Sequence, residues 1–178
     1  MSLSRARALV LVSLLVIAAL VLVLVAVFKD DQSGSNFAKS CPAGAVKVRT
    51  KPLPNTNQIK VNVFNGTSTV GLATTVAEEF RNWGFTVGTV QDAPTKYDKT
   101  AKLSYGRNEI AAAAVVNSYF LAKAVYAFDI KRTDDFVDVT IGSEYAKLGT
   151  KTEVNQAQAQ IGNPSPPVGT CDISDNNG

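Results

Sequence analysis

The stretch VFNGTSTVGLA, from Val63 to Ala73, decides how the chain around it folds. Just before and within it, Ile59, Val61 and Val63 alternate with polar residues, which is the pattern of a half-buried strand. Asn65 and Gly66 then interrupt the strand, because this pair favours tight turns. Small hydroxyl residues follow, and either Ser68 or Thr69 can cap the helix that the next apolar residues predict. The stretch therefore predicts a strand that turns into a helix.

Two functional interpretations of the same stretch compete with a plain turn. Gly66 and Gly71 have the separation of a phosphate-binding P-loop, but Leu72 and Ala73 stand where that motif needs lysine and serine or threonine. Asn65 also begins an N-x-T glycosylation pattern, which matters only in a eukaryotic secretory pathway. We favour the structural turn at Asn65 and Gly66, and we expect no cofactor and no metal.

The residues on either side complete a domain over 59–148. The first helix has an apolar stripe made of Val70, Ala73, Val76, Ala77, Phe80 and Trp83, and Gly84 ends it. Alternating or apolar runs predict further strands, and an alanine-rich run predicts a second helix. These elements are strands at 85–90, 101–105, 125–130 and 137–141, and a helix at 107–121.

The order of these elements suggests a topology. The loop between the second and third strands has about nine residues, whereas a parallel crossover needs about a dozen or more. These two strands are therefore expected to be antiparallel. The result is an α+β fold, a β-α-β-β-α-β split-βαβ (ferredoxin-like) sandwich with both helices on one face, an open opposite face and a fifth strand at one edge.

The N-terminal segment predicts a membrane anchor. Residues 8–28 are apolar except Ser13, which gives a helix of about 31 Å, long enough to cross a bilayer. A cleaved secretory signal is the alternative, but no small-x-small cleavage site follows the apolar run. Arg5 and Arg7 place residues 1–7 in the cytoplasm and the rest of the chain outside. Residues 29–58 then form a polar linker with a short extended piece at Val46 and Val48, and 149–178 form a polar C-terminal tail.

Cys41 and Cys171 are the two cysteines of the chain, and they flank the predicted domain. In an oxidising compartment such a pair forms a disulfide more often than a metal site. We therefore expect Cys41 and Cys171 to be joined, which pins the linker to the C-terminal tail.

A family resemblance covers about half of the chain. The segment IKVNVFNGTSTVGLATTVAEEFRNWGFTVGTVQDAP, together with VDVTIGSEY, resembles the LytR C-terminal domain. That family has a strand ending in V-x-N-G-T, a helix start of V/A-G-L-A, a G-F-x-V strand and a closing D-V-x-x-x-G strand. The matching residues are Asn65, Gly66, Thr67, Gly71, Leu72, Ala73, Gly84, Phe85, Val87, Asp138, Val139 and Gly142.

The resemblance implies a non-catalytic cell-envelope protein. Larger members carry a LytR-CpsA-Psr transferase domain, for which this chain is too short, so it resembles the small single-pass envelope proteins of actinobacteria. Implied partners are the membrane, peptidoglycan or wall glycopolymer, and LytR-CpsA-Psr proteins. Outside the predicted membrane, 16 basic residues face 15 acidic ones, a balance that does not indicate nucleic-acid binding. The chain has no histidine, the commonest general base. A glycan-binding module of SPOR-like type and, less favoured, an envelope enzyme are the alternatives.

Two surface sites are conceivable. If both helices begin at the same edge of the sheet, Thr67 and Ser68 meet Arg107 and Asn108 there and can bind a phosphate of a wall polymer. Plain helix capping is the interpretation we favour. On the open sheet face, Phe64, Tyr126 and Phe128 form an exposed aromatic platform for sugar rings or a partner, provided that Val125 and Ala127 face the helices. If Tyr126 and Phe128 face the helices instead, that strand fills the core, and this second arrangement is favoured.

Overall fold

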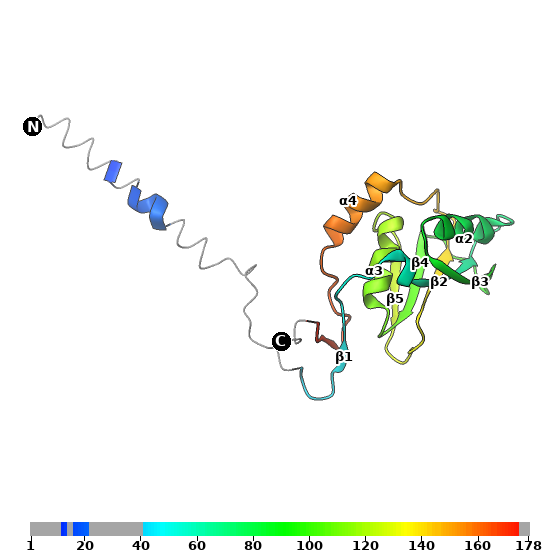
Figure 1. Ribbon diagram of the computed structural model, residues 1–178, viewed down its shortest axis with the longest axis horizontal. Coiled ribbons are helices and arrows are strands. Elements are labelled where there is room, and N and C mark those ends of the chain that lie inside the picture. The colour runs from blue at the N-terminus through cyan, green and yellow to red at the C-terminus, as the bar shows by residue number, and fades with distance from the viewer. Residues whose placement is uncertain (1–11, 14–15, 22–40, 175–178) are drawn as a thin grey trace, which may run out of the picture. The chain divides into compact units, whose positions relative to one another are not determined.

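The computed structural model describes residues 12–13, 16–21 and 41–174 (Figure 1). The chain divides into two units, Met1–Lys39 and Ser40–Gly178. In the first, residues 12–13 and 16–21 are helical and exposed. The predicted anchor at 8–28 and the cytoplasmic tail at 1–7 lie mostly outside the described residues. Among the helices that can be described, none is long and apolar enough to cross a membrane.

The second unit is built on a five-stranded mixed sheet with the order β3-β2-β6-β4-β5. β2 lies parallel to β3 and to β6, β4 lies parallel to β5, and β4 and β6 are antiparallel. The strands are β2 (Lys60–Asn65), β3 (Thr86–Asp92), β4 (Ala101–Gly106), β5 (Val125–Asp129) and β6 (Phe136–Ile141).

This strand order corrects the predicted topology. The split-βαβ arrangement with an extra edge strand is wrong, because β6 lies in the centre of the sheet and β2 and β3 are direct neighbours. The second and third predicted strands, β3 and β4, do run in opposite directions, but β2 and β6 lie between them. β6 is apolar and buried on the helix face. At the centre of a sheet such a strand buries more apolar surface than it would at the edge.

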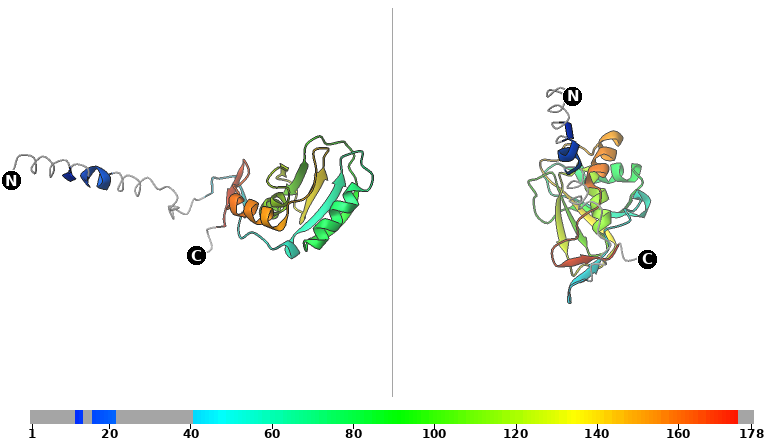
Figure 2. Two further views of the ribbon diagram at one scale, coloured as in Figure 1. Left: turned by 90° about the horizontal axis from the view of Figure 1, so that it is seen from above. Right: turned by 90° about the vertical axis from the view of Figure 1, so that its left-hand side faces the viewer.

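The helices α2 (Leu72–Asn82) and α3 (Ile110–Tyr119) cover one face of the sheet, as expected (Figures 1 and 2). The core between them and the sheet includes Val61 and Val63 of β2 and Leu103 of β4. Phe80 of α2 and Tyr119 of α3 contact each other with ring centroids 6.4 Å apart. α2 ends as predicted at Gly84, whose φ of 90° suits glycine. Phe85 N–H then donates to Phe80 O at 3.0 Å, which completes a Schellman motif.

The C-terminal region is more ordered than its composition indicates. α4 (Lys151–Ile161) packs beside α3 (Figure 1), with Val154 and Ala157 buried. The helix is missing from the sequence-based prediction, which has only a polar tail there. The short strands β1 (Val46–Val48) and β7 (Thr170–Asp172) form a separate parallel ribbon, and a 3-10 helix, η1 (Thr56–Gln58), links β1 to β2. β1 confirms the extended piece expected at Val46 and Val48.

Candidate functional site

The Asn65 side chain organises the turn at the end of β2. It is only 5% exposed, and its Oδ1 accepts hydrogen bonds from the Thr67 N–H at 3.0 Å and the Thr67 hydroxyl at 2.7 Å. Its Nδ2 donates to Thr69 O at 2.8 Å and to Asp92 Oδ1 at 3.1 Å. An asparagine that bonds backbone two residues ahead imitates a backbone turn. The hydrogen-bonding positions of the Asn65 amide are therefore occupied by the protein itself, which supports a structural turn here over a ligand site.

Gly66 and Gly142 let the loop of residues 93–100 pack against the ends of β2 and β6. A Cβ on Gly66 would stand 2.7 Å from Ile141 O, and one on Gly142 would stand 1.9 Å from Lys99 O. Both distances are shorter than any real contact of a Cβ. The backbone bonds use the same closeness, since Tyr97 N–H donates to Gly66 O at 2.8 Å. The two motif glycines thus hold a loop in place.

The start of α2 differs from the prediction. The N-cap is Gly71 in the left-handed region at φ 78°, without a side-chain cap, so neither Ser68 nor Thr69 caps the helix. The hydroxyl of Thr67 instead accepts from the Thr69 N–H at 3.0 Å. Val70, predicted on the inner stripe, is 97% exposed, because the chain turns at Gly71 before the helix begins.

Exposed side chains therefore project from a buried framework at this edge. We define the strand-end tip as Ser68, Thr69, Val70 and Lys96, all of which are exposed. The Lys96 ammonium bonds Thr67 O, which ties the loop of residues 93–100 to the turn. The tip presents hydroxyls, one cation and one fully exposed aliphatic side chain.

The predicted anion site is wrong, because its four residues do not lie together. Thr67 and Ser68 follow β2, whose last residue Asn65 pairs with Ile141, and Ile141 also pairs with Ala101 at the start of β4. Arg107 and Asn108 follow the other end of β4. β2 and β4 are antiparallel with β6 between them, so the two helices begin at opposite edges of the sheet. Asn108 there donates to Thr133 O at 3.1 Å.

The aromatic platform is also wrong, because Tyr126 and Phe128 face the helices as in the alternative, but β5 fills the core only in part. Tyr126 and Phe128 are in register with Leu103 and Tyr105, so they share the helix face, while Phe64 lies on the opposite face. Each of the two rings lies 5.8 Å from the Tyr105 ring. Tyr126 is still 45% exposed because β5 is an edge strand.

The face without helices carries a charged network that the sequence analysis missed. Asp138 accepts from Asn62 Nδ2 at 2.8 Å and from Arg132 at 2.7 Å. Arg132 also donates to Ser104 O at 3.0 Å and makes a two-pronged ion pair with Asp134 at 2.7 and 2.9 Å. The hydrogen bonds from Arg132 hold the pKa of Asp134 below its usual value. Asp134, Asp138 and Ser104 O together accept four hydrogen bonds from the Arg132 guanidinium, so the network links β4 and β6 to the turn between β5 and β6.

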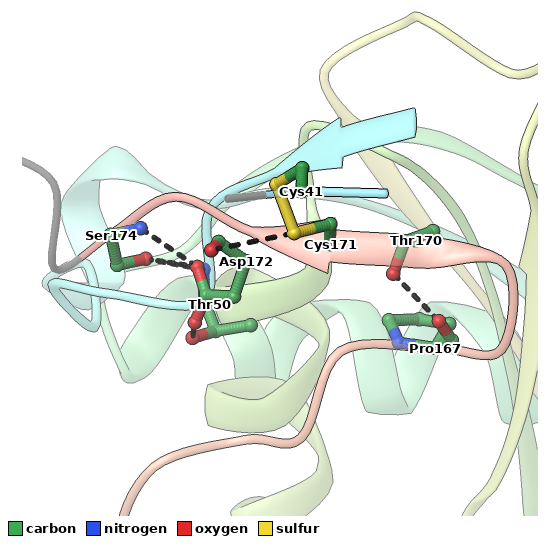
Figure 3. The surroundings of a disulfide bond; sticks show 7 residues. All are labelled: Cys41, Thr50, Pro167, Thr170, Cys171, Asp172 and Ser174. Carbon is green, nitrogen blue, oxygen red and sulfur yellow. Dashed lines mark hydrogen bonds between the residues drawn. A yellow bond between two sulfur atoms is a disulfide. The ribbon is translucent and has the colours of Figure 1, made fainter. Parts of the chain in front are cut away.

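The predicted disulfide is confirmed (Figure 3). Cys41 and Cys171 are bonded with Cα atoms 5.6 Å apart, and Cys171 sits in β7 opposite Lys47 of β1. Beside them, Asp172 holds the Thr50 N–H at 3.3 Å and the Ser174 hydroxyl at 2.6 Å. These bonds join the start and the end of the second unit.

The framework of Asn65, Gly66 and Gly142 on a small α+β sheet defines a class of domain, and comparison with known proteins agrees. The family model described as LytR cell envelope-related transcriptional attenuator matches residues 58–145. These residues are a LytR C-terminal domain. A solved structure, the soluble domain of a conserved hypothetical secreted protein (Rv2700 ortholog) from Mycobacterium marinum, is similar with a TM-score of 0.54 and 26% sequence identity. The likeness covers 66% of this chain and 83% of that one. No curated protein matches the chain.

Proposed function

We propose that the chain is a non-catalytic, membrane-anchored protein of the cell envelope. Its extracytoplasmic domain supports wall integrity by contacting wall polymer or a wall-assembly protein, such as a LytR-CpsA-Psr transferase. The LytR C-terminal domain and its likeness to a secreted mycobacterial protein support an envelope role. The Cys41–Cys171 disulfide supports an oxidising compartment outside the cytoplasm.

One observation carries the contact role. The buried residues of the family motif at the strand ends hold each other, while Val70, inside the same motif, is 97% exposed. An aliphatic side chain gains free energy only when another apolar surface covers it. Between the two kinds of contact, Val70 thus favours a protein partner over a hydroxyl-rich polymer.

Capture from membranes tests this contact. The full-length chain is cross-linked in its native envelope and recovered with wall fragments and lipids retained, and wild type is expected to bring down wall-assembly proteins. Val70→Ser should weaken that capture about tenfold, the equivalent of one buried valine. Val168→Ser is the matched control, because Val168 is also fully exposed, at 101%.

Equal capture by wild type and Val70→Ser would place the contact elsewhere. Peptidoglycan that sediments wild type but not Val70→Ser would make the polymer the partner.

Two further measurements test the anchor and the absence of catalysis. The anchor at 8–28 predicts that the chain stays in the membrane fraction. A mature protein beginning near Lys29 in the culture medium would refute the anchor. Purified ectodomain is expected to turn over neither peptidoglycan nor polyprenyl-linked glycans, and any turnover would make it an envelope enzyme.

A further inference from the structure

Basic side chains line one face of the ribbon formed by β1 and β7. Lys47 and Arg49 are exposed, and they alternate with Val48 and Thr50, which are buried. Lys51 continues the row. The alternation follows from the extended backbone, which points successive side chains to opposite sides. Lys47 and Arg49 therefore project from one face of this segment, and together with the half-buried Lys51 we call them the basic ribbon.

Asp172, the carboxylate of β7 itself, faces the other way. Asp172 is in register with Val48, on the buried side, where its carboxylate accepts from Thr50 and from Ser174. The negative charge of Asp172 is thus stabilised by hydrogen-bond donors inside the fold. Asp172 does not neutralise Lys47 and Arg49 on the outer side.

A hollow of about 400 Å³ adjoins the basic ribbon. Arg49 and Lys51 line it together with Pro52, Leu53 and Asn163. Among the described residues that line it, none is acidic. The hollow thus offers cationic donors, an amide and a small apolar wall. A phosphate group would contact the donors, and a glycerol backbone attached to it would contact the apolar wall.

The position of the basic ribbon in the chain indicates the source of that phosphate. The twelve residues 29–40 separate the predicted span from Cys41, and fully extended they reach about 40 Å. On the anchor of the proposed function, the ribbon can therefore lie on the membrane surface. We propose that the basic ribbon and its hollow bind anionic phospholipid headgroups there. Guanidinium and ammonium groups donate to phosphate oxygens, and each such residue near an anionic surface strengthens binding about fivefold.

Covalent labelling of the full-length chain in vesicles tests this proposal. Vesicles of equal parts phosphatidylglycerol and phosphatidylcholine are compared with vesicles of phosphatidylcholine alone, and the acetylation rate of Lys47 is followed by mass spectrometry. We expect Lys47 to react at least about fivefold more slowly in the anionic vesicles. Lys147, exposed on a different segment, should react equally in both. Arg49→Gln should relieve most of the protection of Lys47, whereas Lys151→Gln, which removes an exposed charge on α4, should not.

Three outcomes would count against parts of the proposal. A Lys47 rate that is the same in both vesicles overturns the lipid site. Protection by soluble glycerol phosphate in neutral vesicles also overturns it, because the ligand is then a free phosphate. Flotation separates these results from a failure of the proposed function. A chain that floats with the vesicles but labels freely loses only the lipid site, whereas one that does not float loses the anchor.

Discussion

At the residue scale, Asn65 shows what the strand-end motif does. One amide serves four hydrogen bonds, and its partners Thr67, Thr69 and Asp92 come from both sides of α2. The sequence predicts the turn, because Asn-Gly after an apolar strand has a local cause. It does not predict Asp92 as a partner, since that contact depends on β3 lying directly beside β2.

Replacing Asn65 by alanine should therefore destabilise the domain. Asn65→Ala removes the four hydrogen bonds of a side chain that is only 5% exposed and leaves the Thr67 N–H and Thr69 O without their partner, and we expect the free energy of unfolding to fall by about 2–3 kcal/mol. Urea unfolding followed by circular dichroism measures it. Asn108→Ala is the control, because Asn108 is exposed and makes a single bond to Thr133 O, so its loss should cost less than about 1 kcal/mol. Equal costs for the two variants would contradict the role assigned to Asn65.

The ion pair between Arg132 and Asp134 predicts a pH dependence. Since the pKa of Asp134 is lowered in the folded state, its contribution to stability is present above the ordinary aspartate pKa of 3.8 and is lost as pH falls through the lower, folded value. Asp134 is about half exposed, so the effect is at most about 1 kcal/mol. Asp134→Asn should therefore lower stability at pH 6 and match wild type at the acid end. Urea titrations across this range check it, and a constant difference at every pH would contradict it.

At the element scale, the strands of the five-stranded sheet and α2 follow from periodicity and α3 from its alanine-rich run, but α4, β7 and the place of β6 do not follow from the sequence. α4 buries only Val154 and Ala157, so its apolar pattern is too weak to detect. A usable signal does exist in Thr150 and Glu153, the T-x-x-E of a capping box. The central position of β6 depends on which strands pair over long distances, and alternation within a strand says nothing about its neighbours. The anion site fails for the same reason, whereas the aromatic platform fails because the facing of β5 depends on its register with β4.

The capping box predicts the behaviour of α4. The Glu153 carboxylate accepts from the Thr150 N–H at 2.8 Å and from its hydroxyl at 2.7 Å. Thr150→Ala should destabilise the domain by about 1 kcal/mol. Hydrogen exchange should then rise first in α4. Thr152→Ala, an exposed change in the same helix, is the control and should have little effect. Unchanged exchange in α4 of the Thr150 variant would show that packing on α3 alone fixes the helix.

At the scale of the whole molecule, the disulfide closes the second unit on itself. Cys41 and Cys171 are 130 residues apart, and a loop of that size restricts the unfolded chain by about 5 kcal/mol in the chain-entropy model. The double change Cys41→Ser and Cys171→Ser should lower the urea midpoint by a corresponding amount without changing the far-ultraviolet spectrum. The sequence predicts this pairing because only two cysteines exist, so no choice of partner arises. A variant as stable as the oxidised wild type would refute the role of the bond.

The same bond also determines how mechanical load passes through the protein. A pull applied between the two ends of the second unit runs from Cys41 straight into Cys171, and the sheet and helices between them carry no tension. In single-molecule stretching by the termini, the oxidised chain should show no unfolding event of the core. After reduction, the same pull should release about 450 Å of chain, because 130 residues become extensible. The disulfide thus lets the second unit transmit tension between its two ends while its folded surface stays intact.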